Sequence, residues 1–193
     1  METKRETSES RLYFPLYETL KELFDLFYVA ESYTIDSKTG RRKAPSNSIR
    51  NPHLEITANG EVSEFLQSKF NYDLFQKLDA ERLNPDLLGF VQKKPSSLEE
   101  FITVEVKRSP LRFRDVLQAK LYEEIFNAKF SFAISPKGMP MKKLKVILEH
   151  NKALRGNVII AQCSDDGRSI WISPILKDYI PKEFRKLCRF NKY

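Results

Sequence analysis

Residues 85–107 read PDLLGFVQKKPSSLEEFITVEVK, and this stretch decides the expected fold. Two apolar, β-rich runs, 87–91 and 101–106, flank the polar residues 92–97, a spacing typical of a β-hairpin. Pro85 is tolerated at the start of the first run because the first residue of a strand need not donate to the ladder. The stretch therefore predicts two strands that pair with each other.

The second run alternates in polarity, as the side chains of a strand do. Its apolar residues share one face and its polar residues share the other, which places Glu105 and Lys107 side by side. Asp86 starts the preceding strand, so pairing of the two strands can bring it near Glu105. Two converging carboxylates make a hard-oxygen site for Mg²⁺ or Mn²⁺. Such an ion can polarise a phosphodiester oxygen, and Lys107 beside it can orient a water or stabilise developing charge.

Patterns outside this hairpin predict a mixed α/β domain with helical additions. Apolar residues at helical spacing predict five helices, which run from Pro15 to about residue 30, from Gly60 to about residue 75, over 114–128, over 139–154 and from Pro181. Further strands are expected over 130–134, 158–161 and 169–172, with an Asp-Gly turn between the last two.

Length and composition fit one domain without a membrane partner. The 193 residues include 33 Lys+Arg against 26 Asp+Glu, and the net charge of +7 favours a polyanion such as nucleic acid. There is no apolar run of about 18 residues, no secretory signal, and no zinc or iron–sulfur spacing around the two cysteines. We expect a cytoplasmic protein with a tail and helical arm (1–33), a polar basic loop (34–58) and a core with a basic C-terminal helix (59–193).

Pro85-Asp86 followed by Glu105-Val106-Lys107 resembles the motif of the PD-(D/E)xK phosphodiesterase superfamily. Three (Asp/Glu)-x-Lys triplets occur in the chain, but only this one lies in an apolar strand after a Pro-Asp. The resemblance implies an α/β restriction-endonuclease-like fold, a mixed β-sheet flanked by helices, here with an N-terminal helical addition. It also implies metal-dependent cleavage of DNA or RNA, in which Asp86, Glu105 and the Val106 carbonyl bind Mg²⁺ or Mn²⁺ and Lys107 is catalytic.

The next predicted helix contains the only Gln-x-x-x-Tyr of the sequence, Gln118 to Tyr122. Positions i and i+4 lie on one helix face, so both side chains can reach the strand ends and position a bound backbone. A Gln-x-x-x-Tyr in the helix after the Glu-x-Lys strand is similar to the RecB-like branch of the superfamily. That branch includes exonucleases and recombination or repair enzymes, and the resemblance covers residues 60–135.

Further candidates surround this motif. The superfamily often carries another acidic residue on the helix before the Pro-Asp strand, and Glu64 is favoured over Glu61, which sits where a carboxylate also serves the helix dipole. Three arginines that follow the second strand can grip phosphates, although a solvated basic loop is the alternative: Arg108, Arg112 and Arg114.

Plainer interpretations stand beside each candidate. The alternatives are that Asp86 caps a turn, that Glu105 and Lys107 form an exposed charge pattern, and that Gln118 and Tyr122 are ordinary surface and core-edge residues. The sequence favours a Mg²⁺-dependent deoxyribonuclease in DNA repair, recombination or replication. The alternatives are an inactive nucleic-acid-binding module on the same fold, or an interaction protein with a coincidental motif. Single-stranded, duplex and branched DNA are all open as substrates, as are a monomer and a homo-oligomer.

Overall fold

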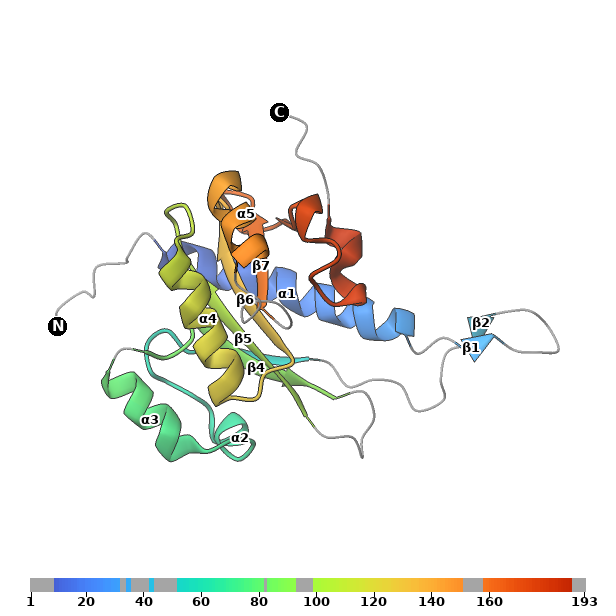
Figure 1. Cartoon of the computed structure of the whole chain (residues 1–193). Coiled ribbons are helices and arrows are strands. Elements are labelled where there is room, and N and C mark those ends of the chain that lie inside the picture. Colours follow the sequence, from blue (N-terminus) through green and yellow to red (C-terminus); the bar gives the residue numbers. More distant parts are fainter. Residues whose placement is uncertain are drawn as a thin grey trace.

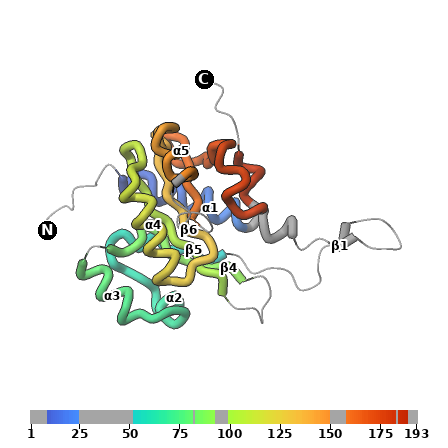
Figure 2. The backbone as a smooth tube through the Cα atoms, in the orientation of Figure 1, coloured from blue at the N-terminus to red at the C-terminus, as the bar shows by residue number. Residues whose placement is uncertain are grey.

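The centre of the protein is a six-stranded mixed sheet (Figure 1). The computed structural model describes residues 9–31, 34–35, 42–43, 52–81, 83–92, 99–150 and 158–188 (Figure 2). The sheet strands, in spatial order, are β3 (His53–Ile56), β4 (Leu87–Val91), β5 (Glu100–Val106), β6 (Phe130–Ser135), β7 (Val158–Cys163) and β8 (Ile170–Trp171). The pairs β5–β6 and β6–β7 are parallel and the others antiparallel. Strands β1 (Thr34–Ile35) and β2 (Arg42–Lys43) pair separately.

Helices cover both faces of this sheet, so the expectation of a mixed sheet flanked by helices is confirmed. Helices α4 (Phe113–Ile125) and α5 (Met141–His150) lie side by side over one face and connect its parallel strands (Figure 1). Helix α1 (Ser10–Glu31) lies on the other face with the 3₁₀ segment η3 (Lys182–Leu187), where aromatic rings from three elements meet. Phe24 of α1 contacts Phe132 and Phe184, with ring centroids 6.2 and 5.8 Å apart.

Helix α1 starts earlier than its sequence predicts, and it forms a layer of the domain. Its apolar residues at helical spacing, Leu12, Leu16, Leu20 and Phe24, are fully buried. Pro15 therefore lies inside the helix, not in its first turn. The β7–β8 turn packs against it, because a Cβ on Gly167 would lie 3.0 Å from the Pro15 Cβ. The Gly167 carbonyl also accepts a hydrogen bond from the Thr19 hydroxyl at 3.0 Å.

Four other predicted elements differ from the structure. Residues expected as one helix form two short ones, α2 (Glu64–Gln67) and α3 (Tyr72–Ala80), because the Asn71 side chain caps a new helix at Leu74 N–H. Strand β3 lies inside the stretch expected as a long loop. The helix predicted over 139–154 begins two residues later, as α5 (Met141–His150), and its predicted end lies outside the described residues. The basic C-terminal helix is the 3₁₀ segment η3.

Strand β3 pairs closely with β4 because β4 carries a glycine. A Cβ on Gly89 would lie 2.1 Å from the His53 carbonyl oxygen, so any side chain there would push the strands apart. A second apolar cluster lies on the face of β4 opposite to α1, where side chains of α2, α3 and α4 meet the strand; it includes Leu66, Phe75, Leu88, Phe90 and Tyr122. The cluster fixes the hairpin from the side opposite to α1.

Candidate active site

The β4–β5 pairing brings two acidic residues to one end of the sheet. The register pairs Leu87 with Val104, so Asp86 and Glu105 occupy the next positions on the two strands. The Asp86 backbone N–H donates to the Val104 carbonyl at 2.9 Å, and the Asp86 carbonyl accepts from the Thr57 N–H at 2.8 Å. The predicted hairpin is confirmed, and backbone bonds on both sides fix the position of Asp86.

The Asp86 carboxylate has a hydrogen bond on each oxygen. Its Oδ2 accepts the Val106 backbone N–H at 2.6 Å, and its Oδ1 accepts the Tyr13 hydroxyl at 2.9 Å. Burial raises the pKa of Asp86 to about 6, against the lowering effect of these two bonds and of the Lys107 charge. The two bonds orient the carboxylate, and they leave lone pairs on both oxygens for a further partner.

Glu105 and Lys107 form a close ion pair beside Asp86. The Lys107 Nζ lies 2.6 Å from Glu105 Oε1, and the Glu105 side chain is only 2% exposed. Burial raises the pKa of Glu105 to about 8, and the neighbouring Asp86 charge adds to this increase. Burial lowers the pKa of Lys107, but the charge and hydrogen bond of Glu105, together with the charges of Asp86 and Glu9, outweigh burial, so the net shift is upward. The depth of Glu105 excludes an exposed charge pattern on this face of β5.

A third acidic side chain comes from a segment that the sequence places in the polar tail. Glu9 precedes α1, and its Oε2 lies 3.9 Å from the Lys107 Nζ. Its charge also raises the pKa of Asp86 and of Tyr13, after the larger effect of burial. Glu9 and Tyr13 are four residues apart, which is the spacing of neighbours on a helix. That spacing, read together with the apolar stripe of α1, is the signal that could have found them.

Glu64 lies elsewhere. It is exposed on α2, whose Phe65 ring packs against Phe90 with centroids 5.9 Å apart. Phe90 is four residues along β4 from Asp86, which corresponds to about 13 Å in a strand. Glu61 is also exposed, and it bonds to the Asn59 side chain at 2.7 Å. The structure therefore gathers Glu9, and neither Glu64 nor Glu61, with Asp86 and Glu105.

Gln118 and Tyr122 of α4 are connected by hydrogen bonds to the backbone that leads into β4. The Gln118 Nε2 donates to the Tyr122 hydroxyl at 2.6 Å, so the two side chains share a helix face as their spacing predicts. The Tyr122 hydroxyl donates to the Asn84 carbonyl at 3.0 Å, two residues before Asp86. Burial raises the pKa of Tyr122, and the Glu105 charge adds to this. Because Tyr122 is fully buried, it positions the site from within the protein.

Two polar residues that the sequence analysis did not single out complete this support. The Asn84 Nδ2 donates to the Thr57 carbonyl at 2.5 Å, and the buried Thr57 hydroxyl donates to the Pro85 carbonyl at 2.6 Å. These bonds connect the end of β3 to the residues that enter β4. They fix the backbone on which Asp86 stands.

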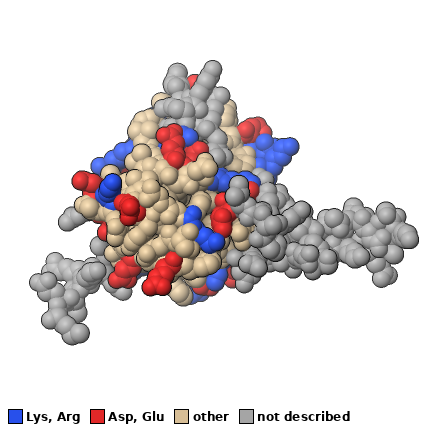
Figure 3. Space-filling view, turned by 90° about the horizontal axis from the view of Figure 1, so that it is seen from below, with Lys and Arg blue, Asp and Glu red and all other residues tan. Residues whose placement is uncertain are grey.

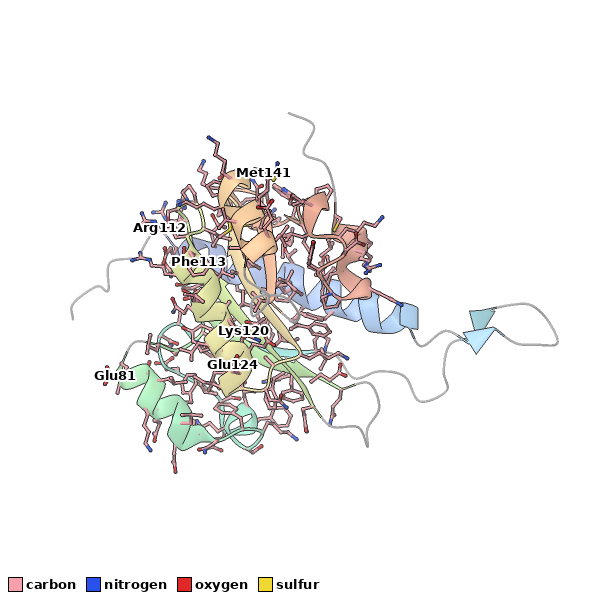
Figure 4. All side chains as sticks on the ribbon, in the orientation of Figure 1. Glu81, Arg112, Phe113, Lys120, Glu124 and Met141 are labelled. Carbon is pink, nitrogen blue, oxygen red and sulfur yellow. The ribbon has the colours of Figure 1, made fainter. Side chains whose placement is uncertain are left out.

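The three candidate arginines are exposed: Arg108 and Arg112 lie between β5 and α4, and Arg114 is the second residue of α4. Arg114 is 77% exposed, with its Nε 3.6 Å from Asp115 Oδ1. The buried Asp115 caps α4 by accepting the Arg112 backbone N–H at 2.7 Å. Figure 4 shows Arg112 at the start of α4 and Met141 at the start of α5, at the same end of the sheet. On the face of the molecule seen in Figure 3, acidic and basic side chains are intermixed, and no single charge dominates.

The acidic side chains of the site offer part of the ligand set that a divalent cation needs. Within the described ranges, no group of three or more His, Cys, Asp or Glu side chains is arranged to hold a metal ion. Asp86 and Glu105 nevertheless fit part of such a site, because both present carboxylate oxygens and the Asp86 charge disfavours ionisation of Glu105. A cation between them would relieve that repulsion.

Comparison with protein-family models, curated proteins and solved structures finds no match for this chain. In the part of the chain that the structure describes, no helix has both the length and the apolar character needed to cross a membrane.

Proposed function

We propose that this protein is a Mg²⁺- or Mn²⁺-dependent deoxyribonuclease of the PD-(D/E)xK type. The observation that supports the proposal is the convergence of Asp86, Glu105 and Lys107 at one end of the sheet. In the proposal, Asp86, Glu105 and the Val106 carbonyl hold the ion, with Glu9 close by. The bound ion supplies Lewis-acid polarisation of the scissile phosphodiester.

The side chains around the acidic pair have separate roles in this proposal. The raised pKa of Lys107 keeps its amine protonated at neutral pH, so it serves as a hydrogen-bond donor and positive charge, not as a general base. It orients the attacking water or stabilises the charge that develops on the phosphate. Tyr13 and the Val106 N–H favour the ionised form of Asp86, since both bonds lower its pKa.

DNA is the proposed substrate because of the charge distribution. The chain carries a net charge of +7, and exposed arginines follow β5 directly. Each phosphate that they neutralise adds to affinity and to its dependence on salt. A restriction-endonuclease-like fold is part of the proposal, supported by the mixed sheet with the motif hairpin near its middle. The role in repair, recombination or replication rests on the resemblance of the Gln-x-x-x-Tyr helix to the RecB-like branch.

The test compares two glutamates of the same strand. Wild type, Glu105→Gln and Glu100→Gln are incubated with end-labelled single-stranded, duplex and branched DNA in Mg²⁺, Mn²⁺ or EDTA. Glu100 is the matched control because it pairs with Lys129 at the other end of β5, at 2.6 Å. We expect metal-dependent cleavage by wild type and Glu100→Gln, and a loss of at least about 100-fold in Glu105→Gln.

Two results would contradict the proposal. Equal cleavage by Glu105→Gln and wild type would show that the activity comes from another site or a contaminant. Binding of DNA by wild type without cleavage in either metal would instead support the inactive binding module. The lengths of the labelled products separate endonuclease from exonuclease action.

A further inference from the structure

A cavity of about 360 Å³ lies between β7, β8 and the start of α5. Most of its wall is apolar and comes from three parts of the chain. The lining includes Met139, Met141, Leu144, Ile160, Trp171 and Ile175. Cavities of about 300–1,000 Å³ with mostly apolar walls and few polar groups are typical of small-molecule sites. None of these residues belongs to the acidic site.

The cavity and the acidic site share one face and one end of the sheet. Strand register pairs Glu105 with Ala133 and Ala133 with Ile160, so these residues share a face. Two residues further along, Ser135 pairs with Gln162 and Gln162 with Trp171. Trp171 therefore lies on the face of Glu105, level with Lys107, and three strands away.

Three strand spacings correspond to about 14 Å. At the rise of about 3.4 Å per nucleotide of a stacked strand, this separation equals about four nucleotides. The turn that connects β6 to α5 lies between the two sites, and it accepts hydrogen bonds from the segment after β5 and from β7. Its Gly138 carbonyl accepts the Leu111 N–H at 2.8 Å, and its Pro136 carbonyl accepts the Gln162 side chain at 2.8 Å. Hydrogen bonds through this turn thus connect the cavity to the segment that follows Lys107.

Trp171 is the one aromatic residue that lines the cavity in the described part of the chain. Among the described residues, the Trp171 Nε1–H has no hydrogen-bond partner, although the atom is shielded from solvent. Because that atom is shielded from water, a molecule in the cavity contacts Trp171 through the rest of its ring and not through this N–H. The indole offers a flat aromatic face to a planar ring.

Basic residues are next to the cavity lining in the sequence. Lys137 precedes the lining residue Gly138, and Lys142 and Lys143 follow the lining residue Met141. All three lysines are exposed. Positive charges next to an apolar cavity match a ligand that joins an aromatic group to an anionic backbone.

We propose that this cavity binds one unstacked nucleobase of the DNA strand whose backbone lies at the acidic site. A nucleobase has a flat aromatic face that can pack against the indole, and its phosphates carry the negative charge that the lysines attract. This inference rests on the proposed function and narrows its substrate class to DNA with unpaired nucleotides. A duplex would first have to unstack and unpair the base, whereas a single strand presents it at the lowest cost.

The test uses Trp171 as its own probe, because it is the only tryptophan of the chain. The protein is titrated in EDTA with a short oligothymidylate, and separately with an abasic oligomer of the same length and backbone. We expect oligothymidylate to quench Trp171 fluorescence and the abasic oligomer to leave it nearly unchanged. In fluorescence anisotropy with labelled oligothymidylate, Trp171→Ala is expected to weaken binding about 5- to 150-fold.

Two exposed residues of α5 provide a matched pair that does not disturb the core. Met141 lines the cavity and is 51% exposed, while Val146 is 55% exposed and does not line it. Met141→Glu and Val146→Glu change the net charge equally. We expect Met141→Glu to lose both the quenching and most of the affinity, and Val146→Glu to keep them.

The outcomes separate this inference from the proposed function. If cleavage depends on Glu105 but both oligomers change the fluorescence equally, or if Met141→Glu and Val146→Glu bind equally well, the nucleobase cavity is refuted and the nuclease stands. If oligothymidylate alone quenches Trp171 but no metal gives cleavage, the cavity is supported and the nuclease proposal fails.

Discussion

The Tyr13 hydroxyl donates a hydrogen bond to Asp86 Oδ1 at 2.9 Å, between residues 73 positions apart in the chain. This bond connects α1, which lies on one face of the sheet, to Asp86, the first acidic residue of the motif, which lies at the end of the sheet. Together with Glu9, it makes the N-terminal helix a part of the candidate site. The helix that the sequence presents as an addition is thus needed to complete the surroundings of Asp86.

Tyr13→Phe should weaken both the site and the fold. The hydrogen bond lowers the pKa of Asp86, so its loss raises that pKa and disfavours the carboxylate that the proposed ion needs. We expect about a tenfold loss of cleavage at neutral pH, and a loss of about 1 kcal/mol in the free energy of unfolding. Urea unfolding and a cleavage assay measure the two effects. Tyr17→Phe, one turn along α1, is the control, and equal losses in both variants would count against a specific role for Tyr13.

Glu9→Gln and Glu64→Gln should differ, although both remove one negative charge. Glu9 lies 3.9 Å from Lys107, whereas Glu64 is exposed on α2. We expect Glu9→Gln to raise the Mg²⁺ concentration needed for half-maximal cleavage several-fold, and Glu64→Gln to leave it unchanged. A metal titration at constant ionic strength makes the comparison. If Glu64→Gln has the larger effect, the third acidic residue comes from α2 after all.

The parts of the fold that could be predicted are those with a repeating local signal. The two apolar runs on either side of residues 92–97 predicted the β4–β5 hairpin, and the i,i+4 spacing predicted that Gln118 and Tyr122 share a face. The start of α1 was misplaced because Pro15 is typical of a first helical turn. In the structure, Pro15 lies inside α1 and packs against Gly167 of the β7–β8 turn, a contact between distant segments.

Other features depend on contacts between distant segments, which no local pattern contains. Strand β3 is four residues long, too short for alternation to distinguish it from a loop, and it forms because Gly89 allows close pairing. The depth of Glu105 follows from α4 covering a face of β5 that its polar residues suggested was open. Likewise, the register of the four strands β5 to β8 is what places Trp171 level with Lys107, and no local sequence pattern contains that register.

Tyr122→Phe should destabilise the protein through its backbone partner. The hydroxyl is buried, and it donates to the Asn84 carbonyl at 3.0 Å. Its removal leaves that carbonyl without this donor, at a cost of about 1–3 kcal/mol. We expect a lower urea midpoint and reduced cleavage, with DNA affinity unchanged. If affinity falls while stability stays the same, Tyr122 contacts DNA directly.

The acidic pair should make stability depend on pH in the absence of metal. The pKa of Asp86 rises from 3.8 to about 6 and that of Glu105 from 4.5 to about 8 on folding. In these windows the folded protein binds more protons than the unfolded chain, so the free energy of unfolding falls as the pH rises. We expect lower stability at about pH 8.5 than at about pH 5.5 in EDTA, measured by urea unfolding. The decline should be smaller in Glu105→Gln and intact in Glu100→Gln, and an equal decline in both would refute this origin.

Metal binding should reverse this loss of stability at high pH, because a cation neutralises the repulsion between the ionised Asp86 and Glu105 carboxylates. An ion at about 100 times its dissociation constant adds about 2.7 kcal/mol to the free energy of unfolding. We expect Mn²⁺ or Mg²⁺ to raise the melting temperature more at about pH 8 than at about pH 6, since protons compete with the ion at lower pH. Glu105→Gln should lose most of the increase, while Glu100→Gln keeps it. Ca²⁺ at the same ionic strength tests hard-cation binding without catalysis, and KCl tests general screening. If KCl raises the melting temperature as much as Mn²⁺ does, or if Glu105→Gln responds like wild type, the ion does not bind at Asp86 and Glu105.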